Sequence, residues 1–104
     1  MDEERVLEAL RQKIQEVMPQ VDGVIALRRV GKGTAPHLFL PGDDLSELAL
    51  FPQFPIPTPV RIIQAKYPDK RFAVVVRGCD ERQLVEMAKR RQIFLDKLTM
   101  IGVA

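Results

Sequence analysis

The segment that most constrains the fold is FAVVVRGCDERQLVEMAKRRQ, residues 72–92, where an apolar run meets a glycine and continues as a helical pattern. The run is rich in β-branched residues, which is typical of a strand covered on both faces. Leu84, Val85 and Ala88 then recur at helical spacing, and we predict a helix from Asp80 to about Phe94. The chain closes with LTMIGVA, a second apolar segment that predicts another buried strand. Strand, helix and strand in this order indicate the crossover unit of a parallel sheet.

The remaining segments supply further helices and strands for the same sheet. Residues 1–19 predict an amphipathic helix, because apolar side chains recur every three or four positions before a proline. Residues 20–41 predict a strand pair that turns at GKGT, residues 42–58 a proline-rich connection, and residues 59–104 a helix–strand–helix–strand unit. At 104 residues, the chain is long enough for one domain. We therefore predict a small single α/β domain with a partly parallel sheet and helices packed on it.

The proline-rich connection allows only local structure. Asp43 or Asp44 is placed to cap a short helical turn that reaches Leu48. Thr58 is placed to cap the next helix, with Pro59 at its first position. Three apolar side chains of the connection are expected on the core: Phe51, Phe54 and Ile56.

Composition and charge exclude several classes of protein. The net charge is only +2, from 16 basic and 14 acidic residues, which disfavours a nucleic-acid partner. No apolar run approaches the roughly 18 residues of a membrane span, and the acidic N-terminus does not resemble a secretory signal, so a cytoplasmic location is expected. The GKGT turn lacks the earlier glycine and the following Ser or Thr of a phosphate-binding P-loop, since position 26 is Ala and Gly33 follows Lys32.

Cys79 is the candidate for chemistry. In parallel sheets, ligands bind beyond the carboxyl ends of the strands, and Cys79 falls at such an end, just before a helix. Asp80 is placed to cap that helix, with Gln83 reaching back. A helix N-terminus favours a thiolate, the form that a metal or an iron–sulfur cluster binds. A small buried cysteine without function fits the same position. The lone His37 lies among apolar residues, where a packed histidine is the ordinary interpretation.

An ordered set of residues resembles the coenzyme F-420 hydrogenase/dehydrogenase beta-subunit family. The set comprises Arg77, Gly78, Cys79, Asp80 and Arg82 at the turn, Leu84, Glu86, Lys89 and Gln92 in the helix, and Ile101 and Gly102 in the closing strand. Upstream, the segment Pro36-His37-Leu38-Phe39 is similar to part of the family's first strand pair. The resemblance extends over about residues 20–104.

This resemblance implies the N-terminal domain of an electron-transfer oxidoreductase subunit that carries an iron–sulfur cluster and FAD when full length. It implies other subunits of a redox complex and a soluble electron carrier as partners. Cys79 is then a cluster ligand or a thiol near the redox site, with further cysteines from outside this chain. Gly78 would allow close backbone approach, Asp80 would hold the turn, and His37 would line the same site.

Two alternatives remain open at this point. One is a non-catalytic assembly module that docks a redox subunit onto its partner through an exposed apolar patch around Phe51 and Phe54. The other is a stand-alone thiol protein that uses Cys79.

The apolar pattern continues to the last residues of the sequence, IGVA. This pattern suggests that more chain follows, and that this piece alone is inactive and binds no cofactor.

Overall fold

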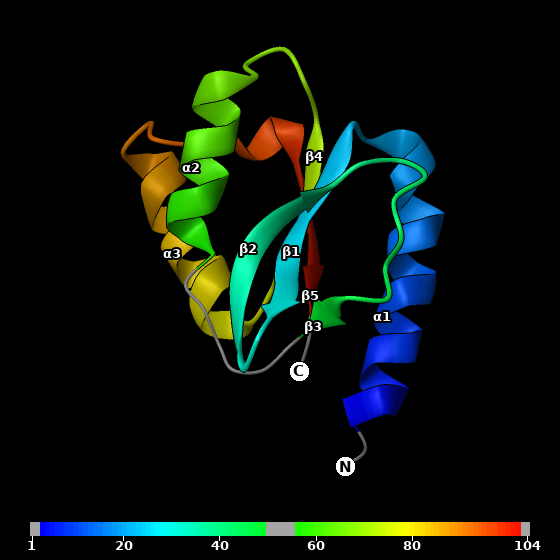
Figure 1. Ribbon diagram of the computed structural model, residues 1–104. Coiled ribbons are helices and arrows are strands. Elements are labelled where there is room, and N and C mark those ends of the chain that lie inside the picture. Colours follow the sequence, from blue (N-terminus) through cyan, green and yellow to red (C-terminus); the bar gives the residue numbers. More distant parts are fainter. Residues whose placement is uncertain (1–2, 50–55, 103–104) are drawn as a thin grey trace.

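A mixed five-stranded sheet with helices on both faces organises the computed structural model, which describes residues 3–49 and 56–102 (Figure 1). The α-helices are α1 (Glu3–Val17), α2 (Pro57–Lys66) and α3 (Gly78–Lys89). The strands are β1 (Gly23–Val30), β2 (Gly33–Phe39), β3 (Leu48–Ala49), β4 (Phe72–Val76) and β5 (Leu98–Gly102). Two short 3-10 helices are η1 (Met18–Gln20) and η2 (Leu95–Lys97). None of the helices in these two described ranges is both long and apolar enough to cross a membrane.

The order of the strands confirms the predicted α/β class. The sheet runs β2-β1-β4-β5, with β1 antiparallel to β2 and parallel to β4, and with β4 parallel to β5. The hairpin predicted around the glycines is present, because Val30 pairs with Gly33 across a two-residue turn. The short β3 pairs with Leu27 and Arg28 of β1, beyond the last residue of β1 that pairs with β4. The sheet is therefore parallel through β1, β4 and β5 and antiparallel at β2 and β3.

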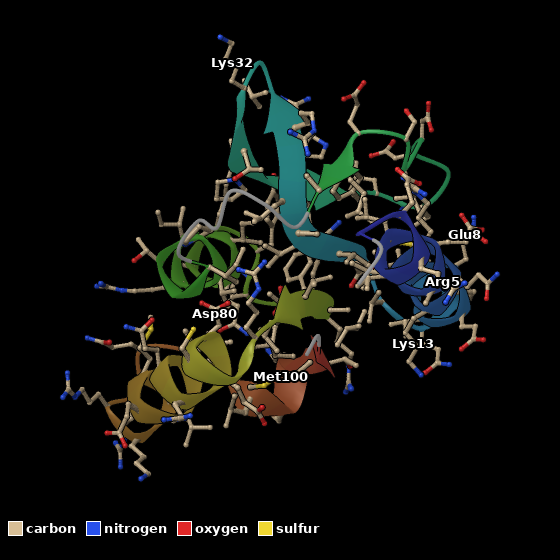
Figure 2. The ribbon with its side chains drawn as sticks, turned by 90° about the horizontal axis from the view of Figure 1, so that it is seen from below. Arg5, Glu8, Lys13, Lys32, Asp80 and Met100 are labelled. Atoms are coloured by element: carbon tan, nitrogen blue, oxygen red, sulfur yellow. The ribbon has the colours of Figure 1, made fainter. Side chains whose placement is uncertain are left out.

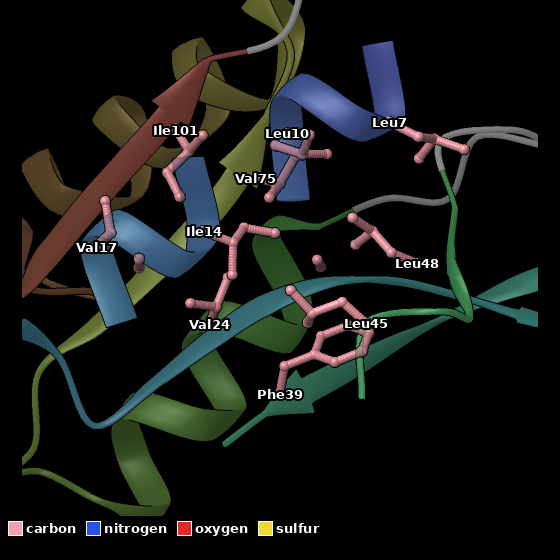
Figure 3. Close-up of a cluster of buried hydrophobic side chains, with 12 residues drawn as sticks. Leu7, Leu10, Ile14, Val17, Val24, Phe39, Leu45, Leu48, Val75 and Ile101 are labelled. Carbon is pink, nitrogen blue, oxygen red and sulfur yellow. The ribbon is translucent and has the colours of Figure 1, made fainter. Parts of the chain in front are cut away.

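Helix α1 covers one face of the sheet, and helices α2 and α3 cover the other (Figure 2). Figure 3 shows the buried cluster on the α1 face. Its side chains come from α1, from all four strands of the main path, from β3 and from the segment that leads to β3: Leu7, Leu10, Ile14, Val17, Val24, Ala26, Phe39, Leu45, Leu48, Ala73, Val75 and Ile101. The second cluster comprises Ile25, Leu27, Ile56, Val60, Phe72, Val74, Val76, Leu84 and Ile93. Successive residues of β4 alternate between the two clusters, which is why its whole sequence is apolar.

The prediction of a buried closing strand is only partly right. β5 pairs with β4 as expected, but only Ile101 among its residues is buried, while Thr99 and Gly102 are exposed. Within the described ranges β5 has a strand neighbour on one side only, so it forms an edge of the sheet. An apolar pattern cannot distinguish an edge strand from a central strand when one face of each is covered.

Both helices of the second half begin earlier than the sequence pattern predicted. α2 starts at Pro57 with Ile56 as its N-cap, so Thr58 lies inside the helix and does not cap it. α3 starts at Gly78 and ends at Lys89, where the prediction had Asp80 to about Phe94. Two prolines near the start of α2 fit the first turn equally well, so the sequence alone could not select the boundary.

The aspartates of the connection form turns instead of capping a helix. Asp43 accepts a hydrogen bond from the Leu40 N–H (2.8 Å), and Asp44 accepts from the Ser46 N–H (2.9 Å). The chain then enters β3, so the helical turn predicted to reach Leu48 is absent from this described stretch. Such local side-chain bonds compete with helix formation. Ile56 is 2% exposed, as expected for a side chain on the core, whereas Phe51 and Phe54 lie outside the described residues.

The end of α3 carries an unusual residue for its conformation. Arg91 has φ of 60°, a left-handed conformation that usually selects glycine. Its N–H donates to the Ala88 carbonyl (3.0 Å), and the Gln92 N–H donates to the Met87 carbonyl (2.8 Å). These two bonds form a Schellman motif, which satisfies carbonyls that the end of the helix leaves free.

We expect the substitution Arg91→Gly to stabilise the domain by about 0.5–1 kcal/mol, because glycine adopts this conformation without a Cβ clash. Arg90→Gly is the control, since Arg90 has an ordinary φ of −89° and glycine should destabilise there. Urea denaturation of the two variants measures the difference. Equal midpoints would contradict the assignment of a left-handed Arg91.

Candidate functional site

The carboxyl ends of the parallel strands meet at one edge of the sheet. Figure 1 shows this edge at the bottom, and Figure 2 looks onto it from below. β4 ends at Val76, which pairs with Gly102 at the end of β5. The chain leaves β4 through Arg77 and enters α3 directly, so the first turn of α3 lies at this edge. The sequence rule that placed Cys79 beyond the end of a parallel strand is therefore satisfied by the topology.

Cys79 is exposed, as the second residue of α3. A Cβ added at Gly78 would meet no neighbouring side chain or backbone atom within 4 Å, so packing against the protein does not require glycine there. The two residues thus present an accessible thiol and an uncrowded backbone at the start of a helix. This arrangement differs from that of a small buried cysteine, which is the ordinary structural use of the residue.

Asp80 holds the turn from inside the helix. Arg77 is the N-cap residue, and its N–H donates to an Asp80 carboxylate oxygen (3.3 Å). The sequence predicted Asp80 as the N-cap and Gln83 as the residue that reaches back. In the structure both roles lie three residues earlier, at Arg77 and Asp80. The carboxylate at the third helical position makes the return bond of a capping box and lies where the helix dipole favours a negative charge.

We expect Asp80→Ala to lower the free energy of unfolding by about 0.5–1.5 kcal/mol, because the return bond to Arg77 is lost. Glu81→Ala is the matched control, since Glu81 is exposed in the same turn and contributes only through the dipole. Urea denaturation of both variants separates the two contributions. A loss in Asp80→Ala no larger than in Glu81→Ala would contradict the role of the return bond.

A groove of about 510 Å³ opens on the other face of the same edge, between α1 and β5. It is lined by Arg5, Val6, Ala9, Leu10, Lys13, Ile101 and Gly102. Its walls are apolar apart from the two cations, which α1 contributes at positions eight residues apart. Figure 2 shows Arg5 and Lys13 on α1, across the sheet from Asp80. Gly102 lines this groove and pairs with Val76, so the groove approaches the strand end from which the Cys79 turn begins.

Sequence reasoning did not identify this groove. The sequence does contain part of the pattern that forms it, because positions 5, 9 and 13 are spaced four residues apart and lie along one side of α1, beside its apolar stripe. The sequence could not show that the stripe lies next to an edge strand, since that depends on the order of the strands.

His37 lies apart from Cys79. Its ring contacts the ring of Phe39 edge-on, with centroids 4.7 Å apart. Phe39 belongs to the buried cluster under α1, whereas α3 packs on the opposite face through Leu84. Residues two apart on a strand share a face, so His37 is on the α1 side. The structure therefore does not bring His37 to the turn that it was expected to line.

The donor atoms available at the turn do not fit an iron–sulfur cluster by themselves. Such clusters are ordinarily held by four cysteine thiolates, and the chain contains one cysteine. Residues 3–49 and 56–102 also contain no group of three or more His, Cys, Asp and Glu side chains arranged to hold a metal ion. Cys79 can supply a single ligand, and the remaining ligands of any cluster must come from elsewhere.

Comparison with known proteins gives one informative similarity. The chain matches no model of a known protein family. It is 50% identical over 42 residues to F420-dependent formate dehydrogenase 1 subunit beta of Methanococcus maripaludis. The match covers 40% of this chain but only 11% of that protein, so the chain corresponds to a small part of its relative. This similarity supports a loose relation to the beta-subunit family and suggests a part of an oxidoreductase subunit.

Proposed function

We propose that this chain is the N-terminal domain of an electron-transfer oxidoreductase subunit related to the beta subunits of F420-dependent formate dehydrogenases. The observation that carries the proposal is the 50% identity over 42 residues to such a subunit. The exposed Cys79 at the carboxyl edge of a parallel sheet supports it, because this edge is where α/β proteins bind their ligands. In this proposal the full-length protein carries an iron–sulfur cluster and FAD.

The residues of the Cys79 turn have separate roles in this proposal. The Cys79 thiol serves as one cluster ligand or lies beside the redox site, and cysteines outside this chain complete the ligand set. Gly78 leaves the backbone open to a close approach, and Asp80 fixes the first turn of α3 through the Arg77 N–H. His37 is given no role in this proposal, because its ring packs against Phe39 on the α1 side of the sheet. The partners are the other subunits of a redox complex and a small electron carrier.

The test is anaerobic reconstitution of the encoded full-length protein with iron and sulfide. We expect Cys79→Ser to lose a large part of the bound iron and of the visible absorbance of the cluster. Glu81→Ser is the matched control, because it changes an exposed residue of the same helical turn without removing a thiol. Unchanged iron content in Cys79→Ser would remove Cys79 as a ligand. An encoded sequence without further cysteines would contradict the cluster proposal as a whole.

A stand-alone thiol function is the second candidate, favoured by the exposure of Cys79. It predicts that an aromatic disulfide reagent modifies one thiol per chain in the folded protein, at a rate within about tenfold of that in urea, because exposure controls access to the sulfur. A thiol that reacts only after denaturation would contradict both this candidate and the exposed position of Cys79. Loss of cluster from Cys79→Ser in the full-length protein would decide in favour of the first proposal.

A further inference from the structure

We propose that the side of the domain opposite Cys79 is a docking surface for an acidic face of a second protein, with Phe94 as its apolar anchor. The surface consists of residues 66–71 and 89–97, called the basic end below. Figure 1 shows these segments together at the top of the view, where α2 and α3 end and where β4 and β5 begin. The identification of the second protein as another subunit of a redox complex rests on the proposed function; the docking surface itself does not.

The basic end concentrates the positive charge of the chain. It carries seven cations, Lys66, Lys70, Arg71, Lys89, Arg90, Arg91 and Lys97, and only two carboxylates, Asp69 and Asp96. Its net charge is therefore +5, whereas the whole chain carries +2, so everything outside it sums to −3. Within the described residues, Lys89 is the only one of the seven in an ion pair, with Glu86 at 3.3 Å. Unpaired like charges in one place oppose folding, and an acidic partner would relieve that repulsion.

Specific contacts hold the segments of the basic end together. The Lys97 ammonium donates to the Pro68 carbonyl, which joins η2 to the loop after α2. The ammonium groups of Lys66 and Lys70 lie 5.5 and 5.8 Å from the centroid of the Tyr67 ring, within the range of cation–π attraction. The cations thus belong to one ordered surface contributed by two separate parts of the sequence.

Apolar side chains lie within this charged surface. Phe94 is 54% exposed and Leu95 is 37% exposed, next to each other in the chain. The backbone of Phe94 is fixed, because the buried Gln64 side chain donates to its carbonyl (2.9 Å) and accepts from its N–H (2.8 Å). An exposed aromatic ring on an anchored backbone loses little further entropy on binding, which is the property of an interface anchor.

The combination of exposed cations with an exposed aromatic ring favours a protein partner over a nucleic acid. Protein interfaces combine an apolar anchor with polar and charged groups, and the basic end offers both kinds of group, the exposed Phe94 and its cations. A nucleic-acid duplex presents phosphates that cations hold, and its stacked bases offer little surface to an apolar Leu–Phe pair. We therefore commit to an acidic protein surface that covers Phe94 and faces Lys66, Lys70 and Lys97 with carboxylates.

Cross-linking in the native complex locates the surface. The full-length protein carrying an affinity tag is isolated from its own cells at low salt and treated with a carbodiimide, which joins lysine amines to carboxylates that contact them. We expect cross-links from Lys66, Lys70 or Lys97 to Asp or Glu residues of a partner. Cross-links confined to Lys13 and Lys32, or isolation of the protein without a partner, would overturn the inference. Lys32 is a suitable reference because it extends from the tip of the hairpin (Figure 2).

Matched variants test the charges and the anchor separately. We expect the double variant Lys66→Glu and Lys70→Glu to bind the identified partner at least about tenfold more weakly, with a reduced salt dependence. Arg28→Glu with Lys32→Glu makes the same change of charge elsewhere and should leave binding nearly unchanged. Phe94→Ser should weaken binding by roughly tenfold or more. Ile62→Ser, at a residue 60% exposed on α2, controls for the loss of any exposed apolar side chain.

The outcomes distinguish this inference from the proposed function. Equal binding by the test and control variants would overturn the docking surface while leaving the redox proposal intact. A partner that is lost from the test variants but is not a redox subunit would keep the docking surface and contradict the proposed function. Displacement of the bound molecule by nuclease treatment, with no cross-linked protein, would show a nucleic acid there and overturn the choice of partner.

Discussion

The variant Gln64→Leu should unfold about 2–4 kcal/mol more easily than the wild-type domain, because it leaves two backbone groups of Phe94 without partners. Gln64 is 5% exposed and is the only buried polar side chain among the described residues. Its amide both donates to and accepts from Phe94, which lies 30 residues further along the chain. Leucine has a similar volume but neither a donor nor an acceptor, so the variant isolates the hydrogen bonds from the packing.

Urea denaturation measures this effect, and two variants control for it. Gln83→Leu makes the same chemical change at an exposed position of α3 and should stay within about 0.5 kcal/mol of wild type. Gln64→Glu keeps an acceptor for the Phe94 N–H but loses the donor to the carbonyl, so a substantial loss is expected there too. A Gln64→Leu protein as stable as Gln83→Leu would show that the clamp contributes nothing. The anchored backbone of Phe94, on which the docking surface depends, would then lose its support.

The local part of the fold could be predicted because each signal lies within a few residues. The β-branched run of β4 and the helical spacing of Leu84, Val85 and Ala88 identify a strand and a helix without any distant contact. The glycines of the hairpin identify the turn between β1 and β2 in the same way. The parallel crossover then follows from the order of the elements, which is why the α/β class is confirmed.

The features that the sequence did not predict correctly depend on contacts between residues that are distant in the sequence. Whether β5 is central or at an edge depends on which strands lie beside it, and its own residues carry no sign of this. The hydrogen bonds of Gln64 join α2 to a loop that follows α3, so no local pattern marks that glutamine as buried. His37 was expected beside Cys79 because both belong to one family resemblance, but the alternation of β2 places it on the opposite face.

The position of Cys79 at the carboxyl edge of the sheet can be predicted from the order of the elements alone. The environment of its side chain cannot, because it depends on the packing of the folded domain. The order of strand and helix alone predicts that Cys79 lies beyond the carboxyl end of β4. The exposure of the thiol and the groove across the sheet are results of packing. Because the first turn of α3 presents Cys79, the stability of the site depends on how firmly α3 is held against the sheet.

Leu84→Ala should therefore have the other large effect, a loss of about 3–4 kcal/mol in the free energy of unfolding. Leu84 is fully buried and is the side chain of α3 that lies deepest in the second cluster, with Val60, Phe72 and Val76. Truncation removes buried apolar surface and leaves a cavity that α2, α3 and the sheet can close only partly. For a domain of about 100 residues, each kcal/mol lowers the melting temperature by roughly 4–8 °C, so thermal denaturation should register the change clearly.

Two variants show whether this loss comes from packing. Gln83→Ala truncates the neighbouring exposed side chain and should change stability by no more than about 0.5 kcal/mol, while Leu84→Met keeps the volume and should cost less than about 1.5 kcal/mol. Cys79 is already exposed, so its rate of modification in the folded Leu84→Ala protein should match that in wild type. A small loss in Leu84→Ala would mean that α3 is not anchored at Leu84. A faster thiol reaction would mean that the first turn of α3 depends on that anchor for its shape as well as its stability.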